Sequence, residues 1–271
     1  MKKVLTIAGS DCSGGAGIQA DLKTIGAFGL YGMSVISAIT VQNTQGVHAV
    51  RVLEEDIVEA QFRAVLEDLF PDAIKIGMVA SRGNIHAIVS VLREYKEAGR
   101  KMPYVVLDPV MISTSGKELL DSEAFEALIG ELFPLVDLIT PNLPEASRLC
   151  GFCILSDKER EDAARELARQ YECSVLIKGG HGSRADDLLY DFISGKCTWY
   201  KNEKIKNDNT HGTGCTLSSA IACGMARGKE LEESICEAKR YITGAISDGM
   251  NLGKGNGPLN HFYNMKSEMH L

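Results

Sequence analysis

The chain has 271 residues, 45% of them hydrophobic, and a formal net charge of −7 at pH 7. A chain of this length can bury one large core, and α/β units of about 250 residues form single domains. We therefore expect one domain over residues 1–271. The negative charge argues against a general nucleic-acid-binding or anionic-membrane surface, although it permits a local anion site.

Membrane and secretion signals are not found in the sequence. No apolar run reaches the length of a membrane span, and the short run that follows the N-terminal lysines lacks a signal-peptide core. The eight cysteines are scattered rather than spaced as a disulfide framework. We therefore expect a cytoplasmic protein with free thiols.

The first predicted elements enclose a glycine-rich loop. A buried strand over Lys3–Ala8 is followed by GSDCSGGAG and by a helix over 18–28, an order that builds ligand-binding edges in α/β proteins. Gly15 and Gly17 partly fit a dinucleotide fingerprint. However, the loop before them is long, the next strand lacks the acidic residue that binds ribose, and no Walker A motif is present. The loop is better interpreted as a substrate wall made of backbone.

Strands and helices then alternate along the chain. The predicted strands are 33–41, 47–53, 73–76, 104–107, 135–139 and 174–177, and the predicted helices are 56–69, 84–96, 144–149, 157–171, 217–226 and 231–247. Residues 188–193 and 198–200 resemble an antiparallel hairpin. This alternation predicts a mostly parallel sheet with helices on both faces and a small antiparallel edge. The tail from Asn251 is irregular.

Several chemically useful residues follow directly after predicted strands. They are Gln42, Met78, Asp108, Asn142 and Lys178. Ligands of parallel sheets bind beyond the carboxyl ends of the strands, so these residues predict one shared site. Each also has a purely structural explanation, since Asp108 and Asn142 beside prolines suit caps or turns and Met78 suits the core.

The stretch 207–224, NDNTHGTGCTLSSAIACG, is the strongest single signal. A polar loop leads through Gly212 and Gly214 into a helix of small residues, and the unpaired N–H groups of such a turn bind anions such as phosphate. Cys215 lies in the first turn, where the helix field favours the thiolate. Inert packing is the alternative for this cysteine, and a Cys215–His211 nucleophile pair is only weakly supported because the turn separates the two residues.

Seven motifs, in order, resemble one known family. GSDCSGGAGIQADLKT, VQNT, KIGM, LDPVM, ITPNLPEA, KGGH and THGTGCTLSSAIA are similar to the hydroxymethylpyrimidine/phosphomethylpyrimidine kinases of thiamine biosynthesis, with likeness from Val4 to about Phe262. The resemblance implies a ribokinase-like three-layer αβα sandwich, ATP and Mg²⁺ as cofactors, and a homodimer. It also implies two successive phosphorylations of 4-amino-5-hydroxymethyl-2-methylpyrimidine.

The resemblance also implies residue roles for the transfer itself. Cys215 matches the catalytic base, and the N–H groups of Gly212, Thr213 and Gly214 match the hole that stabilises the transferring phosphoryl group. Lys178 matches a contact to the ATP phosphates, with Thr213 and Asn142 beside it. The role of His211 is left open, as is that of the tail.

For the substrate and the metal, the resemblance implies two further sets. The pyrimidine contacts are Gln42, Gly9, Asp21 and Met78. The magnesium ligands, direct or through water, are Asp108, Asn142 and Glu145.

Three alternatives to this function are kept. A pyridoxal or pyridoxine kinase would share the fold, but Gln42 favours the aminopyrimidine because a carboxamide can donate to a ring nitrogen and accept from the exocyclic amine. A dinucleotide-dependent oxidoreductase would use Gly15 and Gly17. A pyrimidine sensor without catalysis would have no use for Asp108 and Cys215.

Overall fold

The computed structural model describes residues 1–111, 120–180, 185–202, 205, 207 and 209–265. Within these residues, nine strands form one sheet in the order β3-β2-β1-β4-β5-β6-β7-β8-β9. The strands are β1 Lys3–Asp11, β2 Tyr31–Asn43, β3 Gly46–Val52, β4 Ala73–Ile76, β5 Tyr104–Leu107, β6 Leu138–Ile139, β7 Ser174–Ile177, β8 Asp187–Asp191 and β9 Lys196–Tyr200. The central strands β2-β1-β4-β5-β6-β7 pair in parallel, whereas β3, β8 and β9 pair antiparallel at the two edges.

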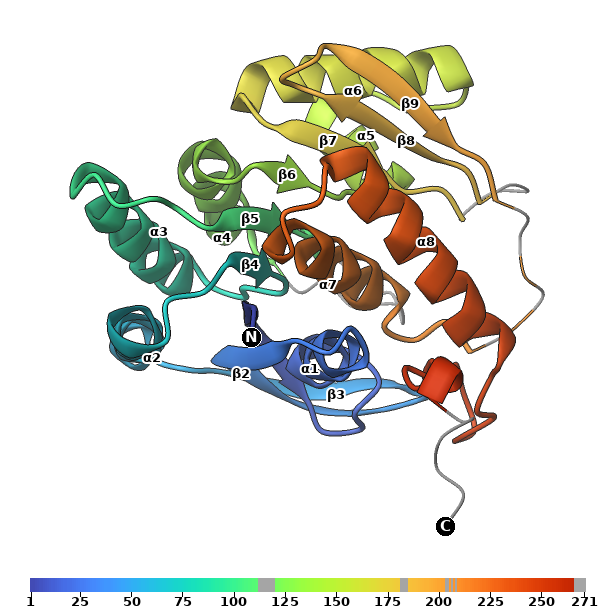
Figure 1. Cartoon of the computed structure of the whole chain (residues 1–271), viewed down its shortest axis with the longest axis horizontal. Coiled ribbons are helices and arrows are strands. Elements are labelled where there is room, and N and C mark those ends of the chain that lie inside the picture. The colour runs from blue at the N-terminus through green and yellow to red at the C-terminus, as the bar shows by residue number, and fades with distance from the viewer. Residues whose placement is uncertain (112–119, 181–184, 203–204, 206, 208, 266–271) are drawn as a thin grey trace.

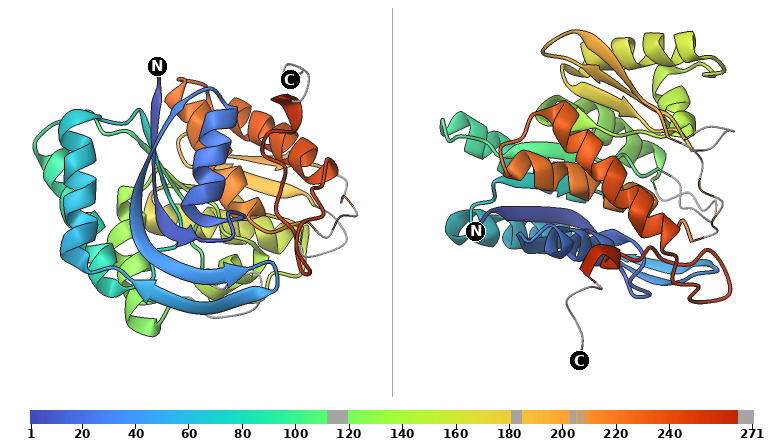
Figure 2. Two further views of the ribbon diagram at one scale, coloured as in Figure 1. Left: turned by 90° about the horizontal axis from the view of Figure 1, so that it is seen from below. Right: turned by 45° about the vertical axis from the view of Figure 1, so that its right-hand side comes forward.

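Helices cover both faces of this sheet, as Figures 1 and 2 show. The α-helices are α1 Gly17–Ala27, α2 Glu55–Asp68, α3 Arg82–Glu97, α4 Ser122–Ala127, α5 Leu143–Cys150, α6 Asp157–Tyr171, α7 Thr213–Ala226 and α8 Leu231–Ser247. Short turns of other helix types are η1 Leu128–Leu132, η2 Phe133–Leu135 and η3 Tyr263–Met265. The three-layer αβα arrangement is thereby confirmed. Among the described residues, no helix combines the length and apolar composition that a membrane crossing requires.

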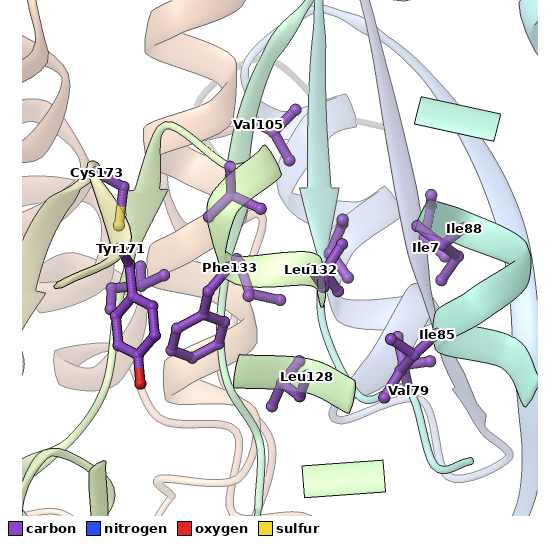
Figure 3. Packing of buried hydrophobic residues seen from close by; sticks show 14 of the residues in the cluster. Ile7, Val79, Ile85, Ile88, Val105, Leu128, Leu132, Phe133, Tyr171 and Cys173 are labelled. Carbon is purple, nitrogen blue, oxygen red and sulfur yellow. The ribbon is translucent and has the colours of Figure 1, made fainter. Parts of the chain in front are cut away.

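Two apolar cores lie on opposite faces of the sheet. Side chains alternate along a strand, so Leu5 and Ile7 pack toward α2, α3 and α6, while Val4 packs toward α1, α7 and α8. Figure 3 shows part of the first core, with Phe133 between Tyr171 and Leu132. Because both faces are buried, the central strands are short continuous apolar runs. The free carboxyl ends of these strands are left to build a site.

Most of the predicted boundaries are confirmed. The strands 73–76, 104–107 and 174–177 and the helices 157–171 and 231–247 are found as predicted. The strand predicted over 135–139 is shorter, because Phe133–Leu135, which contains Pro134, forms a 3-10 turn instead. A second antiparallel edge exists at β3, since the polypeptide turns tightly at Thr44 and Gln45 and pairs back on β2. All eight cysteines are free thiols, as predicted.

Candidate active site

Three elements meet at the first turn of α7. A Cβ atom built on Gly214 would lie 3.0 Å from Oδ2 of Asp108 and 3.3 Å from Nζ of Lys178. Asp108 follows β5 and Lys178 follows β7, and their side chains are joined at 2.5 Å between Nζ and Oδ1. Asn142 is adjacent, since it forms a parallel bridge with Lys178. The predicted gathering of strand-end residues is therefore confirmed for these positions, while His181 of the KGGH motif lies outside the described residues.

Unpaired backbone N–H groups lie at the N-terminus of α7, beside Asp108 and Lys178. Gly212 has a φ of 85°, and a Cβ there would lie 1.9 Å from the carbonyl oxygen of Gly15, so only glycine fits. Within the described part of the chain, the N–H groups of Gly212, Gly214 and Cys215 have no acceptor, whereas Thr213 donates to the carbonyl of Thr210 at 3.3 Å. Together with the positive end of the α7 dipole, these donors form an anion site.

Cys215 lies between the N-terminal ends of two helices. Its sulfur accepts a hydrogen bond from the backbone N–H of Gly17, the first residue of α1. Burial nevertheless raises the pKa of the thiol to about 11, although Lys75 lowers it. Desolvation therefore opposes the shift toward the thiolate that a position in the first helical turn favours.

The acidic residues around Lys178 are more enclosed than the sequence indicated. Asn142 and Glu145 form a reciprocal capping box at the start of α5, with Asn142 Oδ1 accepting from Glu145 N at 2.9 Å and Glu145 Oε2 accepting from Asn142 N at 2.8 Å. Burial raises the pKa of Glu145 to about 7, with Lys178 opposing the shift and Asp108 adding to it.

Whether these residues can hold Mg²⁺ depends on the carboxylate oxygens that they leave free. Among the described residues, no group of three or more His, Cys, Asp or Glu side chains could hold a metal ion. Magnesium, however, is commonly held by one or two carboxylates together with waters and substrate phosphates. Oδ2 of Asp108 fits this use, since it has no partner in the described chain and faces Gly214.

At the other end of the site, Gln42 borders a pocket of about 310 Å³. The pocket is lined by residues 42–47, by His211 and by tail residues 254–256. Gly9 and Met78 lie side by side nearer β1 and β4, since a Cβ on Gly9 would lie 3.2 Å from Cε of Met78. Neither of them belongs to the described lining of this pocket, so the predicted pyrimidine contacts occupy two adjoining places.

Comparison with known proteins gives the family. A family model described as phosphomethylpyrimidine kinase matches residues 11–260. The chain belongs to the phosphomethylpyrimidine kinase family. A hydroxymethylpyrimidine/phosphomethylpyrimidine kinase of Rhizobium meliloti is 48% identical over 96% of this chain and 96% of its own length. A thiamine biosynthesis bifunctional protein of Geobacter sulfurreducens is 47% identical over 95% of this chain, which spans only 52% of that protein.

Solved structures agree with the family and the fold. The phosphomethylpyrimidine kinase of Clostridium difficile is 47% identical, with a TM-score of 0.80 over 91% of this chain and 100% of that one. The pyridoxal kinase of Staphylococcus aureus, solved with ADP, is 34% identical, with a TM-score of 0.87 over 99% of this chain and 96% of that one. The ribokinase-like fold implied by the motifs is thus confirmed.

Asp21 is more deeply buried than its motif implied. The side chain is 0% exposed, and its carboxylate accepts hydrogen bonds from Thr6, Lys75 and Ser219. A carboxylate enclosed in this way has no face left for a ligand. The expectation that Asp21 contacts the pyrimidine directly is contradicted by this burial.

His211 and Asp11 are two residues of the kinase whose importance the sequence did not show. His211 Nε2 lies 2.9 Å from Oδ2 of Asp11 and 2.9 Å from Nε2 of Gln42. Burial opposes the charge of Asp11, but hydrogen bonds from His211 and Ser13 outweigh it and lower its pKa to about 2. The carboxylate also accepts the N–H groups of the glycine loop, including that of Ala16. Only the position of His211 immediately before Gly212 hinted at this contact.

Proposed function

We propose that this kinase transfers the γ-phosphoryl group of ATP to 4-amino-5-hydroxymethyl-2-methylpyrimidine, and then a second one to the monophosphate. One observation carries the proposal. Asp108, Lys178 and the unpaired N–H groups of Gly214 and Cys215 converge at the N-terminus of α7. Phosphoryl transfer depends on positioning and on neutralising charge at the phosphoryl oxygens, and this group of donors supplies both.

In the proposed reaction, the backbone donors and Lys178 hold the transferring phosphoryl group. Burial opposes the charge of Lys178, but Asp108 and Glu145 outweigh it and raise its pKa, so it remains a cation at neutral pH. Cys215, whose own N–H is one of these donors, accepts the proton of the acceptor hydroxyl. Such a proton transfer contributes about 10² to 10⁴ in rate.

We assign the metal-binding role to Asp108 and Glu145, with Asn142 beside them. When bound, Mg²⁺ would neutralise charge on the β- and γ-phosphates. Because Asp108 also bonds to Lys178 at 2.5 Å, it orients the lysine as well. Its second oxygen remains available to a ligand.

We assign the aminopyrimidine to the edge formed by Gln42, Gly9 and Met78. The side chain of Gln42 contacts His211, whose Nε2 also contacts Asp11. Glycine at position 9 lets the end of the Met78 side chain pack against the backbone of β1, since a Cβ there would lie 3.2 Å from Cε of Met78. A polar amide at one end and an apolar wall beside it suit a methylated aminopyrimidine.

Pyridoxal phosphorylation is the second candidate, favoured by the structural likeness to pyridoxal kinase. A coupled assay of ATP consumption distinguishes the two. The purified chain should turn over the hydroxymethylpyrimidine, then its monophosphate, and both faster than pyridoxal. A clear preference for pyridoxal would overturn the first candidate. Because the chain belongs to a kinase family, the dinucleotide-dependent oxidoreductase is excluded.

We also propose a single kinase domain that works as a cytoplasmic homodimer. The continuous nine-stranded sheet of the described residues supports the single domain, and the free thiols are compatible with a reducing compartment. The dimer rests on the resemblance to the family. Light scattering on the purified chain would measure its mass directly.

A further inference from the structure

A fully buried lysine lies under the start of α7 and has no part in the chemistry proposed above. Lys75 is in β4, and the alternation of side chains places it, with Ala73, on the sheet face that α7 covers. Its side chain is 0% exposed. The ammonium group is directed toward the carboxyl end of the strand, since a Cβ on Gly77 would lie 2.7 Å from Nζ. Lysine is almost never buried so fully unless it is paired.

Asp21 supplies the partner charge. Nζ of Lys75 lies 2.9 Å from Oδ1 and 2.8 Å from Oδ2 of Asp21. The same carboxylate accepts hydrogen bonds from Thr6 at 2.6 Å and from Ser219 at 2.8 Å. Thr6 is the register neighbour of Lys75 in the adjacent strand β1. The ion pair is therefore held by β1, α1, β4 and α7 together.

This ion pair lies one helical turn below Cys215. Ser219 follows Cys215 by four residues on α7, and Asp21 follows Gly17 by four residues on α1. Gly17 donates to the sulfur of Cys215, and Ser219 donates to Asp21. The two contacts between α1 and α7 are thus separated by one turn, or about 6 Å along the helices. At such a spacing inside a protein, a charge acts strongly on its neighbour.

We propose that Lys75 is a positioning residue for phosphoryl transfer, whose buried charge stabilises the thiolate form of Cys215 while Asp21 anchors the ammonium group. The inference rests on the proposed role of Cys215 as proton acceptor. In that step the O–H bond of the acceptor breaks and its proton passes to the sulfur. The oxygen forms a bond to the γ-phosphorus, and the bond between that phosphorus and ADP breaks. A positive charge below the sulfur favours the form that can take the proton.

Other charges also face Cys215. Asp108 and Lys178 stand at the ends of β5 and β7, and Asp21 is the partner of Lys75. Lys75 lowers the pKa of Cys215, whereas Asp21 and Asp108 raise it, with Lys75 the strongest of these charges. The two members of the buried pair thus act with opposite signs. Substitutions at the two positions should therefore change the thiol in opposite directions if the role is electrostatic, which a purely structural role would not produce.

The test is the rate at which iodoacetamide alkylates Cys215 at pH 8 in metal-free, nucleotide-free buffer, followed by mass spectrometry of the peptide that carries it. Lys75→Met should slow alkylation and Asp21→Asn should accelerate it, each by about three- to tenfold. A change of one pKa unit alters the thiolate fraction about tenfold, and the changed nucleophilicity of the thiolate offsets part of this. The double variant should fall between the two single variants.

Equal rates in all variants, or changes of the same direction in both single variants, overturn the inference. If Lys75→Met does not fold, the double variant compared with Asp21→Asn isolates the lysine, and the double variant must then be the slower. The apparent pKa in the pH profile of turnover should rise in Lys75→Met and fall in Asp21→Asn, in agreement with the alkylation rates. An unchanged pH profile would also overturn the inference. Because alkylation needs neither ATP nor pyrimidine, a failed kinase assay does not affect this result.

Discussion

Gly214 and Asp108 are so close that no side chain fits between them, since a Cβ on Gly214 would lie 3.0 Å from Oδ2 of Asp108. Gly214→Ala should therefore displace the carboxylate and lower kcat by about 10²-fold, the cost of a misplacement of about 1 Å. The control is Gly26→Ala in α1, where no atom lies within 4 Å of the new methyl group. That variant should keep full activity and gain about 0.5–1 kcal/mol of unfolding free energy. Wild-type kcat in Gly214→Ala would contradict the placement of the site.

Cys215→Ala should nearly abolish phosphoryl transfer, with a loss of about 10² to 10⁴ in kcat because the proton acceptor is gone. Binding of the pyrimidine, measured by calorimetry, should be largely unchanged. Cys236→Ala on α8 is the control, since that thiol is exposed and distant in sequence from the anion site. Equal turnover in Cys215→Ala and the wild type would remove Cys215 from the base role.

Glu145→Gln separates metal binding from helix capping. An amide oxygen can still accept the N–H of Asn142, so the capping box is retained and the melting temperature should not change. If Glu145 organises the metal, the variant should need more Mg²⁺ for half-maximal activity, and added Mg²⁺ should partly restore the rate. Glu159→Gln changes the equivalent capping box of α6 and should have no magnesium effect. An unchanged magnesium dependence in Glu145→Gln would count against the assignment.

His211→Ala should weaken the pyrimidine site rather than the nucleotide site. Without the ring, Gln42 loses its contact with His211, and a loss of about 0.5–1.5 kcal/mol corresponds to an increase of about three- to tenfold in the KM for the pyrimidine. The KM for ATP should remain near the wild-type value. His86→Ala on α3 serves as the control, because that side chain is 42% exposed and, among the described residues, contacts Glu131 and Arg82. An increase confined to the KM for ATP would reverse the assignment of His211.

His261 makes the stability depend on pH. Burial lowers the pKa of its ring from 6.5 to about 4, so the unfolded chain takes up a proton at higher pH than the folded one does. Folding stability should therefore fall as the pH decreases from 6.5 to about 4. In His261→Gln, the decrease in unfolding free energy over this pH range should be smaller by up to about 3 kcal/mol, as measured by urea unfolding at both ends of the range. In the exposed-histidine control His48→Gln, the wild-type pH dependence should persist.

The fold could be predicted wherever pattern and burial agree locally. Four-residue strands such as β4 are uninterrupted apolar runs apart from Lys75, and α6 has a full capping box at Ser156, so the boundaries of both follow from the sequence. Residues 122–135 gave no such pattern, because a short α-helix passes into π and 3-10 turns there and no single helical period is kept.

For the candidate site, the sequence supplied the strand ends and the anion turn but not the long-range contacts. The distance between His211 and Asp11 depends on how the tail and the first loop pack, and these residues are 200 positions apart in the chain. The sequence also did not show how strongly the thiol of Cys215 is desolvated. The sequence showed a cysteine in a first helical turn, which favours a thiolate, whereas desolvation of Cys215 raises its pKa to about 11.

The last described part of the chain packs against the turn that begins α7. Pro258 forms a bridge with His211, and His261 bonds to Thr216 immediately after Cys215. During synthesis, therefore, α7 emerges before Pro258 and His261, the residues that pack against its first turn. A chain interrupted before Pro258 would lack both contacts, so we expect it to be inactive even when its sheet has already assembled.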